Sequence, residues 1–424
     1  MSNMYDLINN FVLTQQWELI YILLHTQCMS FHESQDYIAG KLSNQKGDFA
    51  LISTAGKDVV LKFKDTKVTS RRLSKDSLRA IYSKGAKIKI LDFNLKGDLD
   101  AQIKMLTKGL KKDPNFKGVL PSPKYRKVSN RHDSNLNDFD GTTLLNDAID
   151  LAFQRGADKI DGTFTHGSSN IRLVTSEGAD FDYDTSKLSM SMRAFVNDAS
   201  ATKVISSSNL GDFNYRQKIG EILDLAKQSV SPERFKPGDY SLVLDPLAFS
   251  YIINEFGHAH NFLKRRVGKS VGSEGLTMYD VGNLRGGMGS ASFDGYGHPT
   301  RATEIISSGV LKNVVHNPLN FVVPIGKRSR AKIISDVDKG LLITNFRTAK
   351  HTKNKLNLKS KDAAFVIDKG HIIGSVRQVK LSEDMLKILS GFSDSSNTKE
   401  RILNPAVPTA VELPTVRIDG LKVT

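Results

Sequence analysis

The stretch NIRLVTSEGADFDYDTSKLSMSMRAFV, residues 170–196, decides the fold class of this chain. Apolar and polar residues alternate or group here in the manner of half-buried β-strands. We predict strands over residues 159–167, 170–184 and 188–198. Apolar residues at helical intervals predict a helix before these strands, at residues 143–157, and another after them, at residues 213–230.

The same order occurs earlier in the chain. Residues 47–93 form a predicted strand meander, and residues 98–112 have the spacing of a helix. We therefore predict an α/β N-terminal domain over residues 32–230, built from two similar sheet-and-helix units. Between them, residues 118–140 are rich in Pro, Ser, Asn and Lys, which indicates a linker-like insertion or a long exposed connection.

A second domain is predicted after the turn-forming residues Ser231-Pro232 and Lys236-Pro237-Gly238. Most of residues 231–424 consists of short apolar strands divided by turns, which predicts a mostly antiparallel β-rich domain. The expected fold class is thus α+β. At the other end, residues 1–31 have the spacing of an amphipathic helix that precedes the first domain.

Length and cysteine content restrict the function. A chain of 424 residues is long enough for two domains. The single cysteine, Cys28, excludes an intramolecular disulfide and a Cys-rich zinc site, and it fits a reducing compartment. The apolar run at residues 19–24 is too short for a membrane span and lacks the features of a secretory signal. We expect a cytoplasmic protein that does not bind membranes.

Basic residues raise the question of nucleic acid. The formal net charge is +15, and residues Lys327 to Lys361 hold eleven Lys and Arg against Asp336 and Asp338. Such a basic stripe could neutralise phosphates or attract acidic polypeptides. A solvated face is the favoured alternative, because Phe346 is the only aromatic residue of the stripe and no known nucleic-acid module accompanies it.

The stretch IINEFGHAHNF, residues 252–262, holds the strongest candidate for catalysis. Helical zinc hydrolases use two histidines one turn apart and a glutamate that takes a proton from bound water. Here Glu255 and His258 can share a helix face, but His258 and His260 lie about 200° apart around a helix. The alternatives are a metal site built from His258 and His260 with Glu255 as base, and a polar helix end without chemistry.

Glycine is concentrated in GNLRGGMGSASFDGYGHPTR, residues 282–301. Its spacing does not match a phosphate-binding loop, but glycine at this density indicates close approach of the backbone to other backbone or to a ligand. Asp294, His298 and Arg301 are its candidate substrate-binding residues. A purely structural loop is the alternative. No serine-protease order, nucleophile elbow or paired-carboxylate signature is evident, and Cys28 lies in an apolar segment that favours packing.

Six blocks of sequence occur in an order that resembles the TldD/PmbA family, also called TldD/TldE peptidases or modulators of DNA gyrase. The resemblance covers most of the chain from about Asp48 onward and is strongest after residue 160. The blocks lie at residues 171–196, 234–259, 289–315, 340–346, 363–389 and 413–423.

This resemblance implies an α/β N-terminal domain and a β-rich C-terminal domain that dimerise into a closed chamber. In the catalytic TldD-type subunit, a His-Glu-x-x-x-His helix and a C-terminal cysteine bind a metal that cleaves peptides. The resemblance places Asn254 at the first histidine and Glu255 at the general base, while His258 falls one position before the second histidine. Residues 390–413 contain no cysteine. These departures favour the TldE/PmbA side, which lacks the metal motif.

The sequence therefore leaves three hypotheses. The leading one is a TldD/PmbA-family subunit without an intact metal site, in which Glu255 is vestigial, no cofactor is expected, and any zinc belongs to a TldD-type partner. It would pair with itself or with that partner and assist proteolysis or peptide maturation. The second is an active metal-dependent peptidase with a rearranged site. The third is a basic binding protein for nucleic acid or acidic polypeptide.

Overall fold

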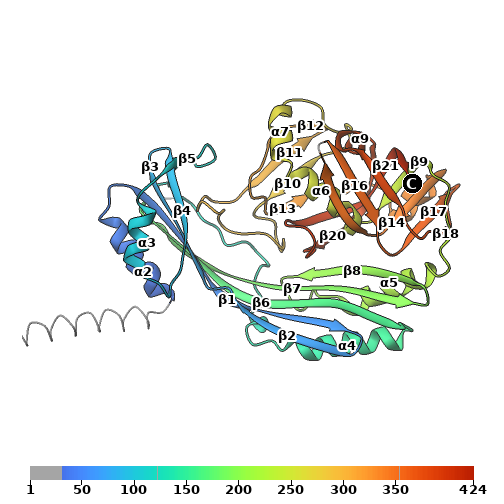
Figure 1. The fold of residues 1–424 in the computed structure, drawn as a ribbon, viewed down its shortest axis with the longest axis horizontal. Coiled ribbons are helices and arrows are strands. Elements are labelled where there is room, and N and C mark those ends of the chain that lie inside the picture. The colour runs from blue at the N-terminus through green and yellow to red at the C-terminus, as the bar shows by residue number, and fades with distance from the viewer. Residues whose placement is uncertain (1–30, 122, 353) are drawn as a thin grey trace, which may run out of the picture.

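The computed structural model describes residues 31–121, 123–352 and 354–424, which form two sheets with helices on them. The helix predicted over residues 1–31 lies almost entirely outside the described residues, as does Cys28. Figure 1 shows the N-terminal sheet as a long curved layer that extends beneath the C-terminal domain. The mixture of helices with two mostly antiparallel sheets confirms the α+β prediction.

Three long strands form the centre of the N-terminal sheet: β1 (Asp48–Lys64), β6 (Lys159–Thr175) and β7 (Asp180–Val196). All three are antiparallel, and β8 (Ala199–Ser207) continues the sheet beyond β7. The strand predicted over residues 170–184 is therefore wrong in its bounds. It comprises the end of β6, a turn and the start of β7, because Gly178 adopts a positive φ of 78° that reverses the chain.

The two predicted sheet-and-helix units share this one sheet, since β1 of the first unit pairs with β6 of the second. β3 and β2 follow each other along the opposite edge of β1. The remaining elements of this domain are α2 (Phe31–Ser43), β2 (Lys67–Ser74), β3 (Ser77–Lys84), β4 (Lys87–Phe93), α3 (Leu99–Leu106), β5 (Lys111–Lys112), η1 (Ser134–Leu136), α4 (Gly141–Gln154) and α5 (Tyr215–Gln228).

The two faces of the N-terminal sheet have different partners. On one face, α4 and α5 bury apolar side chains such as Phe164, Leu188 and Met190. The opposite face meets the C-terminal domain at β7 and β8, where the buried carboxylate of Asp362 accepts hydrogen bonds from Arg193 Nε at 2.7 Å and from two hydroxyl groups. Successive residues of each strand therefore serve different partners, as the two-residue alternation of strands requires.

The chain changes sheet between α5 and β9 (Gly238–Leu244), where the domain boundary was predicted. β21 lies at the centre of the C-terminal sheet, between β9 and β13. The other elements are α6 (Pro246–Gly257), α7 (His260–Leu263), η2 (Lys264–Arg266), β10 (Met278–Val281), β11 (Ala302–Ser307), β12 (Val310–Leu311), β13 (Asn320–Val322), α8 (Arg330–Ser335), β14 (Lys339–Ile343), β15 (Phe346–Thr352), β16 (Lys355–Ser360), β17 (Ala364–Asp368), β18 (His371–Ser375), β19 (Lys380–Asp384), α9 (Met385–Ser390), β20 (Phe392–Ile402) and β21 (Ala410–Val423).

The segment predicted as a linker, residues 118–140, is packed in part rather than exposed throughout. Arg131 is buried and donates to the carbonyl of Ser290 at 3.2 Å and to Thr185 Oγ1 at 2.7 Å. The Tyr125 hydroxyl donates to the carbonyl of Gly297 at 2.7 Å. These bonds tie the segment to the glycine-rich loop, so it forms part of the contact between the two domains.

Across the described ranges, no helix combines the length and apolar character needed to cross a membrane.

Candidate functional site

The candidate catalytic stretch forms α6 and the turn after it. α6 starts at Pro246 in its first turn, where a missing N–H has no cost, and nearly all of its residues are buried in the C-terminal core. Its last turn packs very closely: a Cβ atom placed on Gly257 would lie 2.1 Å from Phe321 Cζ. The last turn of the helix is therefore fixed against β13, and packing sets the orientation of its polar side chains.

Asn254 faces the start of β21 rather than solvent. Its side chain is 3% exposed. Its Oδ1 accepts the backbone N–H of Thr409 at 3.0 Å, and its Nδ2 donates to the Thr409 carbonyl at 3.3 Å and to the Ser250 carbonyl at 3.0 Å. The amide thus pairs with both backbone groups of Thr409 in the way that a neighbouring strand would.

His258 also contacts Thr409. Its Nε2 lies 2.8 Å from Thr409 Oγ1, at hydrogen-bond distance, and its ring lies edge-on to Phe321. The structure therefore brings Asn254 and His258 together around one residue of the segment that leads into β21. His260 begins α7, but its side chain lies outside what the structure describes.

Glu255 lies on another side of α6, half-buried and near His351 of β15. Burial raises the pKa of Glu255, and the nearby imidazole of His351 partly opposes that shift. A carboxyl group with a raised pKa is the usual property of a general base or acid, but it is also what half-burial alone produces.

The donors at this end of α6 are few for a zinc ion. A structural or catalytic zinc site takes at least three protein ligands from His, Cys, Asp or Glu. The amide of Asn254 is occupied by Thr409, and His258 offers one imidazole that bonds to the same residue. In the searched residues 31–121, 123–352 and 354–424, no group of three or more such side chains could hold an ion.

The other end of α6 holds a charged cluster that sequence analysis missed. Asp245, which precedes the helix and is 3% exposed, accepts Arg330 Nε at 2.7 Å, Arg330 Nη2 at 3.0 Å and Thr415 Oγ1 at 3.2 Å. Burial opposes ionisation of Asp245, but Arg330 and Lys203 outweigh it and hold its pKa below the usual value. The only sequence signal was Asp245-Pro246, which is typical of a helix start.

The glycine-rich loop brings its candidate residues to the N-terminal sheet. Asp294 accepts the backbone N–H groups of Tyr296 and His298 at 2.8 and 3.0 Å, so it organises the loop itself. His298 Nε2 lies 2.8 Å from the carbonyl of Gly118, and Arg301 is exposed away from this cluster. These contacts favour the structural alternative for Asp294 and His298. Substrate binding by the three residues stays a prediction.

Aromatic residues of the same loop dock into the sheet. Phe293 is 4% exposed and packs edge-on against Tyr183 of β7, with ring centroids 5.5 Å apart, and against Tyr125 at 6.0 Å. Gly297 adopts a φ of 84°, and a Cβ there would lie 3.1 Å from Leu173 of β6. Position 297 therefore requires glycine, both for that backbone conformation and for the close contact with Leu173.

The predicted basic stripe is not one surface. Arg328 and Lys332 form ion pairs with Asp336, which follows α8, and Arg330 forms one with Asp245, which precedes α6. Exposed basic residues remain on the β15–β16 hairpin, including Arg347, Lys350 and Lys355. The pairing lowers the charge available to phosphates, and binding of nucleic acid or acidic polypeptide stays a prediction.

This arrangement, a curved antiparallel sheet joined to a β-rich domain that carries one buried helix, defines a two-domain α+β class of protein. The family profile of the PmbA/TldA metallopeptidase C-terminal domain matches residues 237–319 and 317–424. The resemblance to the TldD/PmbA family is thereby confirmed over the C-terminal domain.

Solved structures share the whole fold. A Thermotoga maritima protein named as a modulator of a DNA gyrase superposes with a TM-score of 0.81, at 15% identity over 93% of this chain and 100% of that one. TldE from Thermococcus kodakarensis gives a TM-score of 0.78, at 14% identity over 93% of this chain and 100% of that one. At such low identity these likenesses show the fold alone.

Two curated relatives come from Methanocaldococcus jannaschii. The uncharacterized protein MJ0231 is 26% identical over 207 residues, which is 46% of this chain and 49% of that protein. The metalloprotease MJ0996 is 23% identical over 272 residues, 54% of this chain and 60% of that protein. The matches thus span about half the length of these curated relatives.

Proposed function

We propose that this chain is a TldD/PmbA-family subunit without an intact metal site of its own, which assists proteolysis or peptide maturation in a dimeric chamber. Its partner is a second copy or a TldD-type catalytic subunit that supplies the zinc. The resemblance to TldE in fold and the family of the C-terminal domain support the assignment.

The observation that carries the proposal is the pairing of Asn254 with Thr409. A side chain at the first ligand position of the family motif is neutral and bonded on both its donor and its acceptor side to one backbone segment. Freeing it for a metal would leave two buried backbone groups of Thr409 unsatisfied, at a cost of about 1–3 kcal/mol each. The motif position has thus become part of the packing of β21.

Co-expression with a TldD-type subunit tests this proposal. We expect a stable complex in which this chain increases peptide cleavage by the catalytic subunit, while the chain alone cleaves nothing. Asn254→His in this chain should leave that stimulation in place, whereas replacing the metal-binding histidines of the catalytic subunit should abolish cleavage. If the chain forms neither a homodimer nor a complex and leaves cleavage unchanged, the proposal is wrong.

The half-buried Glu255 supports a second candidate function, an active metal-dependent peptidase with a rearranged site. Its raised pKa suits a proton acceptor, and His258 could supply one ligand. Metal analysis of the purified chain separates the two functions. A working site must be largely occupied, so less than about a tenth of an equivalent of zinc, manganese or iron eliminates the second.

A further inference from the structure

Two lysines meet one aspartate on the face of the N-terminal sheet that is turned toward the C-terminal domain. Asp58 of β1, Gly167 of β6 and Lys187 of β7 stand opposite one another in one row across the three strands. Ser189, two residues further along β7 on the same face, donates to the carbonyl of Leu403 in the C-terminal domain at 3.1 Å. The row therefore lies beside the contact between the two domains.

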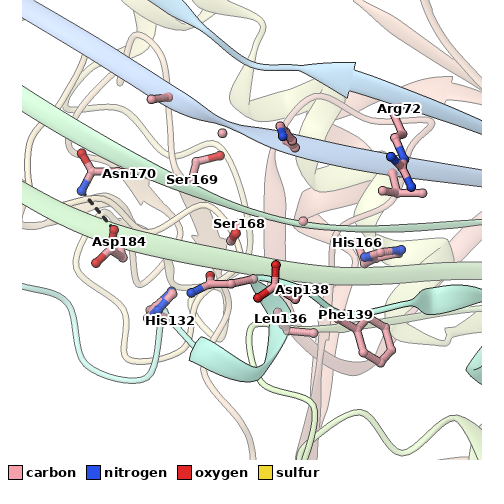
Figure 2. Close-up of a pocket in the computed structure, with 16 residues that line it drawn as sticks. Arg72, His132, Leu136, Asp138, Phe139, His166, Ser168, Ser169, Asn170 and Asp184 are labelled. Atoms are coloured by element: carbon pink, nitrogen blue, oxygen red, sulfur yellow. Dashed lines mark hydrogen bonds between the residues drawn. The ribbon is translucent and has the colours of Figure 1, made fainter. Parts of the chain in front are cut away.

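The neighbours of this row on β6 point the other way. His166 and Ser168 flank Gly167, and both line the cavity that Figure 2 shows between the sheet and the loop of residues 132–139. Because successive side chains of a strand alternate between the two faces, this cavity and the side chains of Asp58 and Lys187 lie on opposite sides of the sheet. The side chains that line the cavity are therefore separated from Lys187 by the sheet itself.

Gly167 allows Lys187 to reach across β6. A Cβ atom at position 167 would lie 2.5 Å from Asp58 Oδ1, so a side chain there would collide with the carboxylate. With glycine in between, Lys187 Nζ lies 2.8 Å from Asp58 Oδ2, although β1 and β7 do not pair with each other. Lys75, between β2 and β3, places its Nζ 2.9 Å from the same oxygen. Two amino groups thus share one carboxylate oxygen.

One carboxylate cannot neutralise two ammonium groups. Both nitrogens contact Asp58 Oδ2, which places them less than about 6 Å apart, a distance at which like charges repel in a partly buried setting. The other oxygen, Oδ1, is buried and has no hydrogen-bond partner among the described residues, so it does not draw one of the lysines away. One of the two amines therefore gives up its proton more easily than an ordinary lysine does.

Lys187 is the amine that loses its proton first. Its side chain is 25% exposed, against 36% for Lys75, so water stabilises its charge less. Burial and the charge of Lys75 lower the pKa of the Lys187 ammonium, and the hydrogen bond to Asp58 opposes them only in part. Asp58 faces Lys187 from β1, and Lys75 faces it from the segment between β2 and β3. The exposed part of the side chain leaves it accessible to a small molecule.

We propose that Lys187 is a nucleophilic amine that forms an imine with the aldehyde or ketone group of a small molecule. A lysine beside a second cationic group is one of the ways in which proteins make such a nucleophile. The neutral Nζ attacks the carbonyl carbon, and a proton moves from nitrogen to oxygen to give a carbinolamine. The Lys75 ammonium then donates a proton to the hydroxyl, which leaves as water while the C=N bond forms.

The remaining proton on nitrogen returns to Lys75. In sum, an amine and a carbonyl compound give an imine and water, and no oxidant or reductant takes part. Asp58 then faces one cation instead of two, which removes the repulsion between the two lysines. The proposal does not depend on the proposed function, because neither a metal nor a partner subunit takes part.

Reductive trapping of the full chain with pyridoxal 5′-phosphate tests the proposal. Borohydride converts an imine into a stable amine, and peptide mass spectrometry then gives the labelled fraction at each lysine. We expect Lys187 to be labelled at least about tenfold faster than the exposed Lys67 near neutral pH, because a lowered pKa increases the fraction of neutral amine. Labelling of Lys187 no faster than that of Lys67 would overturn the proposal.

Pyridoxal, which lacks the phosphate, separates a reactive amine from an anion site. Lys187 should keep its advantage over Lys67 with this probe, because the neutral amine and not the phosphate sets the rate. An advantage seen with pyridoxal 5′-phosphate alone would show that the site attracts the phosphate, and would also overturn the proposal.

Substitutions separate a reactive amine from a structural ion pair. Lys75→Gln removes the second charge and should slow the labelling of Lys187 about tenfold. Lys62→Gln is the matched control, because Lys62 is exposed on the same strand as Asp58, and it should leave the rate unchanged. Lys187→Arg keeps a cation for Asp58 and should remove the fast labelling, with an unchanged circular dichroism spectrum. Equal rates at Lys187 in Lys75→Gln and in the unsubstituted chain would contradict the activating role of Lys75.

Failure of this inference differs from failure of the proposed function. Labelling requires neither a dimer nor a metal, so a chain that stimulates a TldD-type subunit without fast labelling excludes only the nucleophilic lysine. Fast labelling of a chain that forms no dimer and stimulates no cleavage would exclude only the proposed function.

Discussion

The two ends of α6 hold the same strand in different ways. At the N-terminal end, Asp245 is ionised, and it is held by Arg330 and by the hydroxyl of Thr415 in β21. At the C-terminal end, the neutral amide of Asn254 and the imidazole of His258 hold Thr409, the residue before β21. A buried charge needs a counter-charge, whereas a buried amide needs only matching hydrogen bonds.

This difference shows two ways in which the buried ends of a helix can be satisfied. At the end with Asn254 and His258, the hydrogen bonds to Thr409 are individually weak. At the end with Asp245, the contact with Arg330 joins two charges and is the stronger one. Substitutions at the two ends should therefore differ in the size of their effect on stability.

The largest effect is expected from Arg330→Met. It leaves Asp245, whose side chain is 4% exposed, as a buried carboxylate without its main counter-charge. We expect the free energy of unfolding to fall by about 3 kcal/mol, measured by urea denaturation. Arg328→Met is the control: its side chain is 52% exposed, so the loss should stay below about 1 kcal/mol. Equal losses for the two variants would show that the buried Asp245–Arg330 pair stabilises the fold no more than an exposed ion pair does.

The next largest loss of stability is expected from Asn254→Ala. It removes the amide that bonds to both backbone groups of Thr409, which leaves these groups buried without partners. The free energy of unfolding should fall by about 2 kcal/mol. Asn44→Ala is the control: it removes an exposed amide and should change the free energy of unfolding by less than about 0.5 kcal/mol. A loss at Asn254 no larger than at Asn44 would contradict the role given to its amide.

A pair of threonine substitutions compares the two ends directly. Thr415→Val removes a hydrogen bond to an ionised carboxylate, and Thr409→Val removes one to an imidazole. Bonds to charged groups are stronger, so we expect losses of about 1.5 and about 1 kcal/mol, in that order. The double variant should show additive losses, because the two sites share no partner. A larger loss of unfolding free energy for Thr409→Val than for Thr415→Val would contradict the difference between the two ends of α6.

The smallest effect is a pH dependence at Glu255. Its pKa in the folded chain is raised above the ordinary 4.5 by burial. At a pH below both pKa values, the carboxyl of Glu255 is protonated in the folded and in the unfolded chain. As the pH rises, the carboxyl ionises first in the unfolded chain, so the free energy of unfolding falls. The Glu255→Gln variant has no carboxyl at this position and therefore lacks this pH-dependent loss of stability. Its advantage in unfolding free energy over the unsubstituted chain should grow from about pH 4 toward neutrality, and an advantage that shrinks over this range would contradict the raised pKa.

Much of the fold was predictable because strands and helices have short periods. The alternation around Leu188 and Met190 correctly predicted strands, and the spacing at residues 143–157 predicted α4. The turn at Gly178 was missed because the residues on both sides of it continue the same pattern. The boundaries of β6 and β7 depend on which residues pair, which a local pattern does not contain.

The candidate site was predictable only in part. The sequence singled out Glu255 and His258 by their spacing, but it contained no sign that Asn254 would bond to Thr409, 155 residues away. Asp245 and Arg330 were equally hidden, since 85 residues separate them.

The sequence by itself determined the α+β class and the family resemblance, because each depends on residue type and local spacing. Only the tertiary structure decided which groups satisfy Asn254 and Asp245, and that the glycine-rich loop docks on the N-terminal sheet. These facts are pairings between distant segments. Their energies come from burial and hydrogen bonding, which exist only after the sheets have assembled.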